Sequence, residues 1–198
     1  MTGTPAPYAI RPLDPGTWPA FAALVEANGG IFGGCWCIGF HAERFAWRGY
    51  EARRDAKEAM VRAGTTHAAL VFEGEACLGW AQFGSVDELP AIKNRKAYDA
   101  TLDVLPDWRI TCLYVGKGRR RRGVAEAAVR GALHEIAALG GGSVEGYPED
   151  VAGRKVSGTF LWNGTLAMFE RLGFVPVRKI GKHKWVVRRN VAAGEVVT

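Results

Sequence analysis

The chain has 198 residues and a formal net charge of +6, and 48% of its residues are hydrophobic and 23% charged. This composition is typical of a globular protein with one hydrophobic core, and it excludes disordered and collagen-like chains. No apolar run reaches the roughly 18 residues that a membrane helix needs. The first residues show no signal-peptide pattern. These observations predict a cytoplasmic protein that does not act at a membrane.

The positive charge is concentrated in one place. Without the four consecutive arginines at 119–122, the net charge falls to +2. The other basic residues are scattered, as on a solvated surface, so the charge does not favour a nucleic-acid partner. No cysteine or histidine pairs occur at zinc-binding spacing, so we expect no metal. The cysteines are Cys35, Cys37, Cys77 and Cys112.

The first third of the chain predicts a strand followed by two helices. The strand covers residues 8–11, and Asp14 caps the helix that follows. That helix has its apolar residues at helical spacing; they are Trp18, Phe21, Ala22 and Val25. A second helix is expected over residues 43–62, in one piece or in two around Gly49, and Gly64 ends it.

The rest of the chain alternates between strand and helix patterns. Strands are expected at residues 68–72, 76–83, 108–115, 143–147, 174–180 and 184–189. Helices are expected at residues 123–139 and 165–172, with a helical piece inside 87–107. We expect one domain over residues 1–189, followed by a loose tail at 190–198.

The clearest functional signal is the loop between the strand at 108–115 and the helix that follows it. A helix N-terminus presents unpaired backbone amides and a partial positive charge, which favour a bound phosphate. Gly123 and the small Ala125 let a ligand approach the backbone. The pattern therefore predicts a phosphate site. The alternative is a solvated basic turn, which has no need of small residues at these offsets.

Two motifs in order carry a family resemblance. Arg120, Gly123 and Ala125 match (Arg or Gln)-x-x-Gly-x-(Gly or Ala), five residues past Val115, and a Leu-Gly-Phe signature stands at 172–174. From residue 68 to 189 the chain resembles the GNAT-type acyl-CoA N-acyltransferases. The resemblance implies an α/β (α+β) fold. Its mixed, mostly antiparallel, twisted sheet has six or seven strands, is flanked by helices and is splayed at its two central strands.

The resemblance also implies an activity, an N-acetyltransferase that moves an acetyl or other small acyl group from acetyl-CoA to a primary amine by direct attack. The acceptor would be a small molecule or a peptide. The pantetheine arm would lie along the central strand, where an amide near Leu113 would stabilise the oxyanion. The implied cofactor-binding residues are Leu113, Tyr114, Val115, Arg120, Arg121, Arg122, Gly123, Val124, Ala125, Trp162 and Phe169.

Other functions remain open beside this one. The chain could be a transferase or binding module that acts on RNA or charged tRNA, or a CoA-sensing protein without catalysis. Many relatives use a tyrosine as proton donor where this chain has Phe169, which cannot donate. Tyr147 is the substitute acid that we predict, and Glu145, on the same strand face, is the predicted base. The thiolate could also leave unaided, and both residues could instead be structural.

By the same resemblance, the glycine-rich loop at 29–39 and the two residues after it are expected to form part of the acceptor site. In relatives this region shapes the acceptor pocket, and packing of an aromatic loop on the core is the alternative. The residues concerned are Cys35, Trp36, Cys37, Phe40 and His41. The terminal hairpin could pair between subunits, which would give a homodimer.

Overall fold

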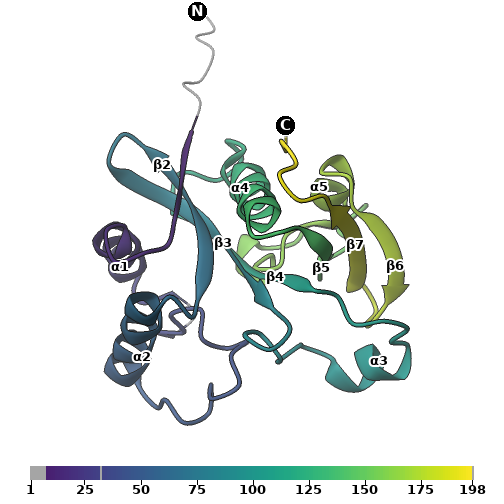
Figure 1. The fold of residues 1–198 in the computed structure, drawn as a ribbon, viewed down its shortest axis with the longest axis horizontal. Coiled ribbons are helices and arrows are strands. Elements are labelled where there is room, and N and C mark those ends of the chain that lie inside the picture. The colour runs from purple at the N-terminus through teal and green to yellow at the C-terminus, as the bar shows by residue number, and fades with distance from the viewer. Residues whose placement is uncertain (1–7, 32, 198) are drawn as a thin grey trace, which may run out of the picture.

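The structure is a computed structural model that describes residues 8–31 and 33–197. In this part of the chain seven strands form one sheet, in the order β1-β2-β3-β4-β5-β7-β6 (Figure 1). Their bounds are β1 Ala9–Pro12, β2 His67–Glu73, β3 Ala76–Ser85, β4 Trp108–Val115, β5 Gly142–Gly146, β6 Val175–Lys179 and β7 Trp185–Val191. Neighbouring strands are antiparallel except β4 and β5, which are parallel. The predicted fold class is confirmed.

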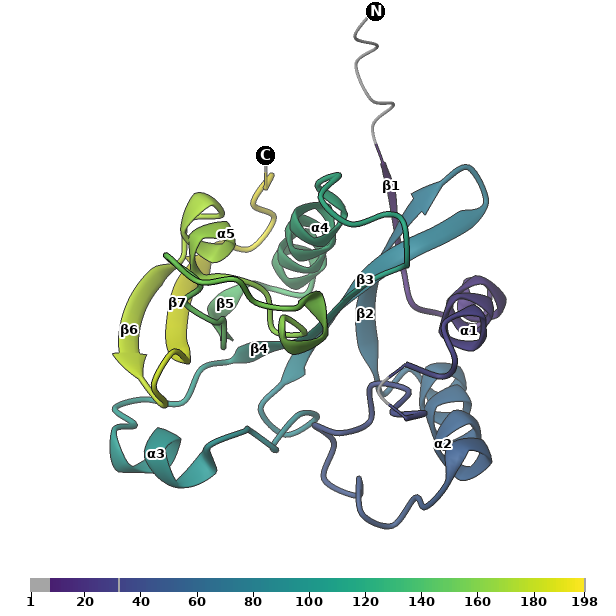
Figure 2. The same ribbon diagram turned by 180° about the vertical axis from the view of Figure 1, so that it is seen from behind.

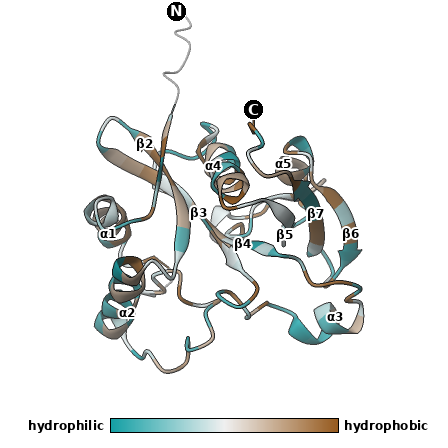
Figure 3. Cartoon of the chain, viewed as in Figure 1, coloured by the Kyte–Doolittle hydropathy of each residue, from teal (hydrophilic) through white to brown (hydrophobic). Residues whose placement is uncertain are grey.

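Helices cover both faces of the sheet (Figures 1 and 2). Their bounds are α1 Trp18–Ala27, α2 Tyr50–Ala63, α3 Arg95–Ala100, α4 Val124–Ala138 and α5 Leu166–Arg171. The core residues of α4 and α5 form one hydrophobic cluster with the sheet, and those of α1 and α2 form another. Hydrophilic and hydrophobic colours lie side by side on α2 and α4, as expected of amphipathic helices (Figure 3). Within the described ranges, no helix has the length and apolar character to cross a membrane.

Strand β2 explains why the sheet needs cover on both faces. Ala69 and Val71 pack in the cluster of α4, whereas Leu70 and Phe72 pack in the cluster of α1. Successive side chains of a strand point to opposite faces. A strand that is covered on both faces is therefore apolar along its covered length, as β2 is at residues 68–72.

The two central strands separate partway along their length. β4 and β5 pair only from Trp108↔Val144 to Ile110↔Gly146. Beyond this point the segment between β5 and α5 passes over β4, as the light green trace in Figure 2 shows. There the Leu113 amide donates a hydrogen bond to the Trp162 carbonyl (2.7 Å). The expected splay is present, and a loop of the same chain fills it.

Two helix starts differ from the sequence-based expectation. α1 begins at Trp18 with Thr17 as its N-cap, and Asp14 instead accepts a hydrogen bond from the Thr17 amide (2.9 Å) in the preceding turn. The buried residues of α1 are the four expected ones. α2 begins only at Tyr50, because Gly49 has φ +88° and interrupts any helix that comes from residue 43.

The predicted tail is partly docked. β7 continues to Val191, because β5 offers pairing partners as far as Gly142↔Val191. Beyond the strand, the Gly194 amide donates to the Ala137 carbonyl (2.9 Å), and Arg189 forms an ion pair with Glu195. These contacts connect residues 190–195 to the domain, and the looseness of the tail at 190–198 stays a prediction.

Candidate active site

The loop before α4 has the backbone geometry of an anion site. Gly118, Arg121 and Gly123 have φ values of +79°, +62° and +79°, which turn the chain sharply into the helix. The first intrahelical hydrogen bond runs from the Ala127 amide to the Gly123 carbonyl. Within the described residues, the amides at positions 124–126 have no partner in the chain. They therefore point out of the helix N-terminus and can bind an anion.

These amides open into a groove of about 890 Å³ between α4, α5 and the end of β4. Most of the predicted cofactor-binding residues line it, namely Leu113, Tyr114, Val115, Arg120, Arg121, Gly123, Val124, Ala125 and Trp162. Residues from the segment before α5 and from α5 itself complete the wall. The structure thus brings the sequence motif and the end of the central strand into one groove.

The four arginines of the loop differ in their surroundings. Arg119 forms an ion pair with Glu73 (2.8 Å), and the carbonyl of Arg122 accepts a hydrogen bond from the Tyr8 hydroxyl (2.8 Å). Arg122 does not line the groove. Arg120 and Arg121 line it, and among residues 8–31 and 33–197 neither has a carboxylate partner. These two guanidinium groups are available for charge-assisted hydrogen bonds to a phosphate.

The backbone of β4 faces the groove at alternate residues. The Gly116 amide donates a hydrogen bond to the Leu78 carbonyl on β3. In an antiparallel pair only alternate residues bond to the neighbouring strand, so the backbone groups of residues 112, 114 and 116 face β3. The backbone groups of Leu113 and Val115 therefore point to the open side. The Leu113 amide already binds the Trp162 carbonyl, and the Asn163 side-chain amide binds the Thr111 carbonyl. A pantetheine arm that bonded to the Leu113 amide would have to displace Trp162.

Trp162 also lines a second cavity of about 420 Å³, which we call the acceptor pocket after the role predicted for its glycine-rich loop. The acceptor pocket is lined by Cys35, Cys37, Gly39, Phe40, Arg44, Ala91, Ile92, Lys93, Cys112 and Trp162. Three of the five predicted loop residues thus line it. The other two, Trp36 and His41, are buried and do not line it, which agrees with packing on the core. The acceptor role of the three lining residues stays a prediction.

A buried polar cluster lies beneath the acceptor pocket. The Sγ atoms of Cys37 and Cys112 are 3.1 Å apart, and the hydrogen bond between them lowers the pKa of Cys37. Lys57 donates to the Thr66 hydroxyl (2.7 Å), and burial lowers the lysine pKa. Burial also lowers the pKa of His41 to about 3. Sequence reasoning missed Lys57, because a lysine on an amphipathic helix is typical of a solvated face.

Glu145 and Tyr147 are brought together, but away from the groove. Both are buried, and the Glu145 carboxylate accepts hydrogen bonds from Tyr98 (2.8 Å), Tyr147 (3.2 Å) and Arg188 (2.8 Å). Burial raises the pKa of Tyr147 well above 10. Tyr147 borders a small gap that shares Phe40 with the acceptor pocket. The catalytic roles of Tyr147 and Glu145 stay predictions.

Phe169 lies in the core behind the groove. It is fully buried, its ring centroid is 4.9 Å from that of Phe174, and it does not line the groove. Its neighbour Met168 and the N-cap residue Thr165 supply the groove wall instead. In the described ranges, no group of three or more His, Cys, Asp or Glu residues is arranged to hold a metal ion.

Comparisons with known proteins were made at the level of sequence and of structure. No family model matches the chain, and no curated protein matches it by sequence. Solved structures match along almost the whole length. One is described as an acetyltransferase of the GNAT family from Desulfovibrio desulfuricans, with 19% identity, a TM-score of 0.53, and 94% of this chain and 100% of that chain covered.

Two further structures agree with the first. An N-acetyltransferase from Staphylococcus aureus matches with 14% identity and a TM-score of 0.51, over 95% of this chain and 99% of that chain. The PaiA N-acetyltransferase from Thermoplasma acidophilum, in complex with coenzyme A, matches with 11% identity and a TM-score of 0.52, over 93% and 99%. The chain therefore has the fold of the GNAT N-acetyltransferases.

Proposed function

We propose that the protein is an N-acetyltransferase that transfers an acetyl or other small acyl group from acetyl-CoA to a primary amine. The observation that carries this proposal is the groove at the α4 N-terminus. Within the described residues, its amides at 124–126 have no partner, and Arg120 and Arg121 have no carboxylate partner. Coenzyme A is strongly anionic, because it carries a pyrophosphate and a further phosphate. A helix N-terminus contributes about 0.3–1 kcal/mol to the binding of an exposed anion, and up to about 2 when it is partly buried.

The two cavities divide the reaction between them. The pantetheine arm would run from the α4 N-terminus along the open side of β4, and the amine would enter from the acceptor pocket. Trp162 lines both, so the thioester carbon and the amine would meet beside it. The neutral amine attacks the carbonyl carbon, and a backbone amide on the open side of β4 stabilises the oxyanion. The C–S bond then breaks, and the leaving thiolate of coenzyme A takes up the proton that the amine nitrogen loses, directly or through water.

Binding of acetyl-CoA tests the first half of the proposal. At a hundredfold excess over its dissociation constant, the ligand should raise the free energy of unfolding by about 2.7 kcal/mol and raise the melting temperature accordingly. Gly123→Ala should remove most of this shift, because its Cβ would project where the phosphate approaches the loop.

Gly118→Ala is the matched control. Both glycines have φ +79°, and a Cβ at either would meet no other atom within 4 Å, so the two variants carry similar backbone strain. Gly118 does not line the groove. Both variants should lose similar stability, and only Gly118→Ala should keep the ligand-induced shift. If acetyl-CoA raised the melting temperature of both variants equally, the phosphate would have to bind at a site other than the α4 N-terminus.

A further inference from the structure

The acceptor pocket has an apolar wall. The ring centroids of Phe40 and Trp162 are 5.7 Å apart, with an interplanar angle of 51°. Ala91 and Ile92 extend this surface. Aromatic and aliphatic walls of this kind bind apolar groups, and they offer no carboxylate that could pair with an ammonium group. The pocket volume of about 420 Å³ lies in the range typical of small-molecule sites.

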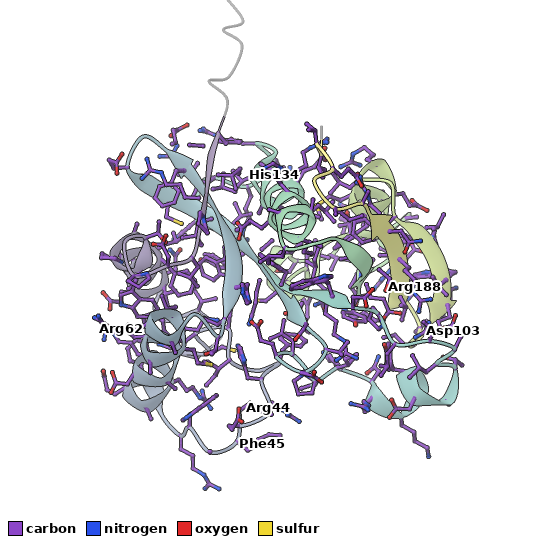
Figure 4. All side chains as sticks on the ribbon, in the orientation of Figure 1. Arg44, Phe45, Arg62, Asp103, His134 and Arg188 are labelled. Carbon is purple, nitrogen blue, oxygen red and sulfur yellow. The ribbon has the colours of Figure 1, made fainter. Side chains whose placement is uncertain are left out.

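Two cations border the same pocket. The Lys93 ammonium is exposed and lies 5.4 Å from the centre of the Trp162 ring. The Arg44 guanidinium lies 4.3 Å from the centre of the Phe45 ring and donates to the His41 carbonyl (3.3 Å); Figure 4 shows Arg44 and Phe45 next to each other. Across the part of the chain that the structure describes, neither cation forms an ion pair.

A third cation near Trp162 is already paired. The Lys184 ammonium lies 5.0 Å from the ring centre, but it is already bound to Glu149 (3.2 Å) and to Asn163 (2.8 Å). Among the described residues that line the acceptor pocket, none is acidic. An amine that carries only positive charge would therefore meet repulsion without a counter-ion.

We infer that the acceptor is an amino acid or a close analogue, a primary amine that also carries a carboxylate and an apolar side chain. This inference rests on the proposed function. The carboxylate pairs with Lys93 and Arg44, and the side chain packs on Phe40 and Trp162. The amino group then faces Trp162, across which the thioester lies.

Matched pairs of amines test the inference directly. Thiol release from acetyl-CoA is followed with phenylalanine against phenethylamine, with leucine against isopentylamine, and with spermidine. Each amino acid should exceed its carboxylate-free partner in kcat/KM by about tenfold or more, mainly through a lower KM, since a hydrogen bond to a charged group supplies this factor. Spermidine should be the poorest acceptor.

The variant Lys93→Met tests whether this pocket causes the preference for acceptors that carry a carboxylate. Lys93→Met keeps an unbranched side chain against Trp162 but removes the charge, so the preference for the carboxylate should shrink about tenfold. The matched control is Lys96→Met, because Lys96 is an exposed lysine on the nearby α3 and lines neither cavity. This control should keep the preference, and both variants should keep the acetyl-CoA-induced thermal shift.

The outcomes separate this inference from the proposed function. Equal or better turnover of phenethylamine or spermidine would overturn the acceptor class and leave the acetyltransferase intact. If Lys93→Met kept the full preference for amino acids over their carboxylate-free partners, the acceptor pocket would not be the site that binds the carboxylate. If acetyl-CoA gave no thermal shift, or if no amine released thiol, the proposed function would fall and the acceptor inference with it.

Discussion

Glu145 shows how a single buried carboxylate connects three elements. It lies on β5 directly opposite Arg188 on β7, and it also accepts a hydrogen bond from Tyr98 on α3. Arg188 in turn reaches the exposed Asp103, and the two side chains lie close together in Figure 4. A buried charge is tolerated only when it is paired and hydrogen-bonded. The contacts of Glu145 therefore favour a structural role beside any catalytic one.

Glu145→Gln should destabilise the protein by about 3–5 kcal/mol, because it leaves Arg188 without its buried counter-charge. Urea unfolding followed by circular dichroism measures this change. Asp103→Asn is the control, since it removes the solvent-exposed partner of the same arginine and should alter stability only slightly. A stable Glu145→Gln protein would contradict the structural role.

Loss of turnover in a stable Tyr147→Phe protein would assign Tyr147 to the chemistry.

At the scale of elements, α4 packs so closely on the sheet at Gly131 that a side chain there has no room. A Cβ atom placed on Gly131 would lie 2.5 Å from Cγ2 of Ile10 and 3.1 Å from Cβ of Ala69. The neighbouring Ala128 and Ala132 are also small and fully buried. Small residues on this face set the distance between helix and sheet, and so the position of the α4 N-terminus in the groove.

Gly131→Val should therefore lower the free energy of unfolding by about 1–3 kcal/mol through overpacking. Thermal or urea unfolding measures the loss. Ala138→Val adds the same valine to an exposed position of α4 and should cost much less. Ile10→Ala combined with Gly131→Val should recover part of the stability that Gly131→Val loses. If the double variant were no more stable than the sum of the two single changes, the steric explanation would be wrong.

At the scale of the whole molecule, the charge distribution separates the acetyltransferase from a nucleic-acid binder. The arginine-rich loop lines one groove, whereas many cations elsewhere are already paired, as Arg62 is with Glu58. Such a surface favours one compact anionic ligand over a long polyanion.

The affinity for acetyl-CoA should fall only moderately as salt rises from about 0.05 M to about 0.5 M, because few charges are involved and they lie in a groove. An unstructured RNA should not bind at physiological salt. Calorimetry for acetyl-CoA and filter binding for RNA measure the two affinities. Tight RNA binding with a steep linear dependence of log affinity on log salt would favour the alternative function.

The sequence by itself determined the local features of the protein. The bounds of β4, the left-handed end of α2 at Gly64 and the buried face of α1 all agree with the structure. The helix expected from residue 123 begins one residue later, at Val124, with Gly123 as its N-cap. These features depend on neighbours within a few residues, through side-chain periodicity and through the backbone freedom of glycine.

Only the tertiary structure decided what surrounds those features. The carbonyl of Trp162 occupies the Leu113 amide, and Arg188 and Tyr98 bury the Glu145 carboxylate. Lys93 comes to lie against Trp162 at the acceptor pocket. Each of these contacts joins residues more than 40 positions apart. They arise from the packing of whole elements, which no local pattern in the sequence encodes.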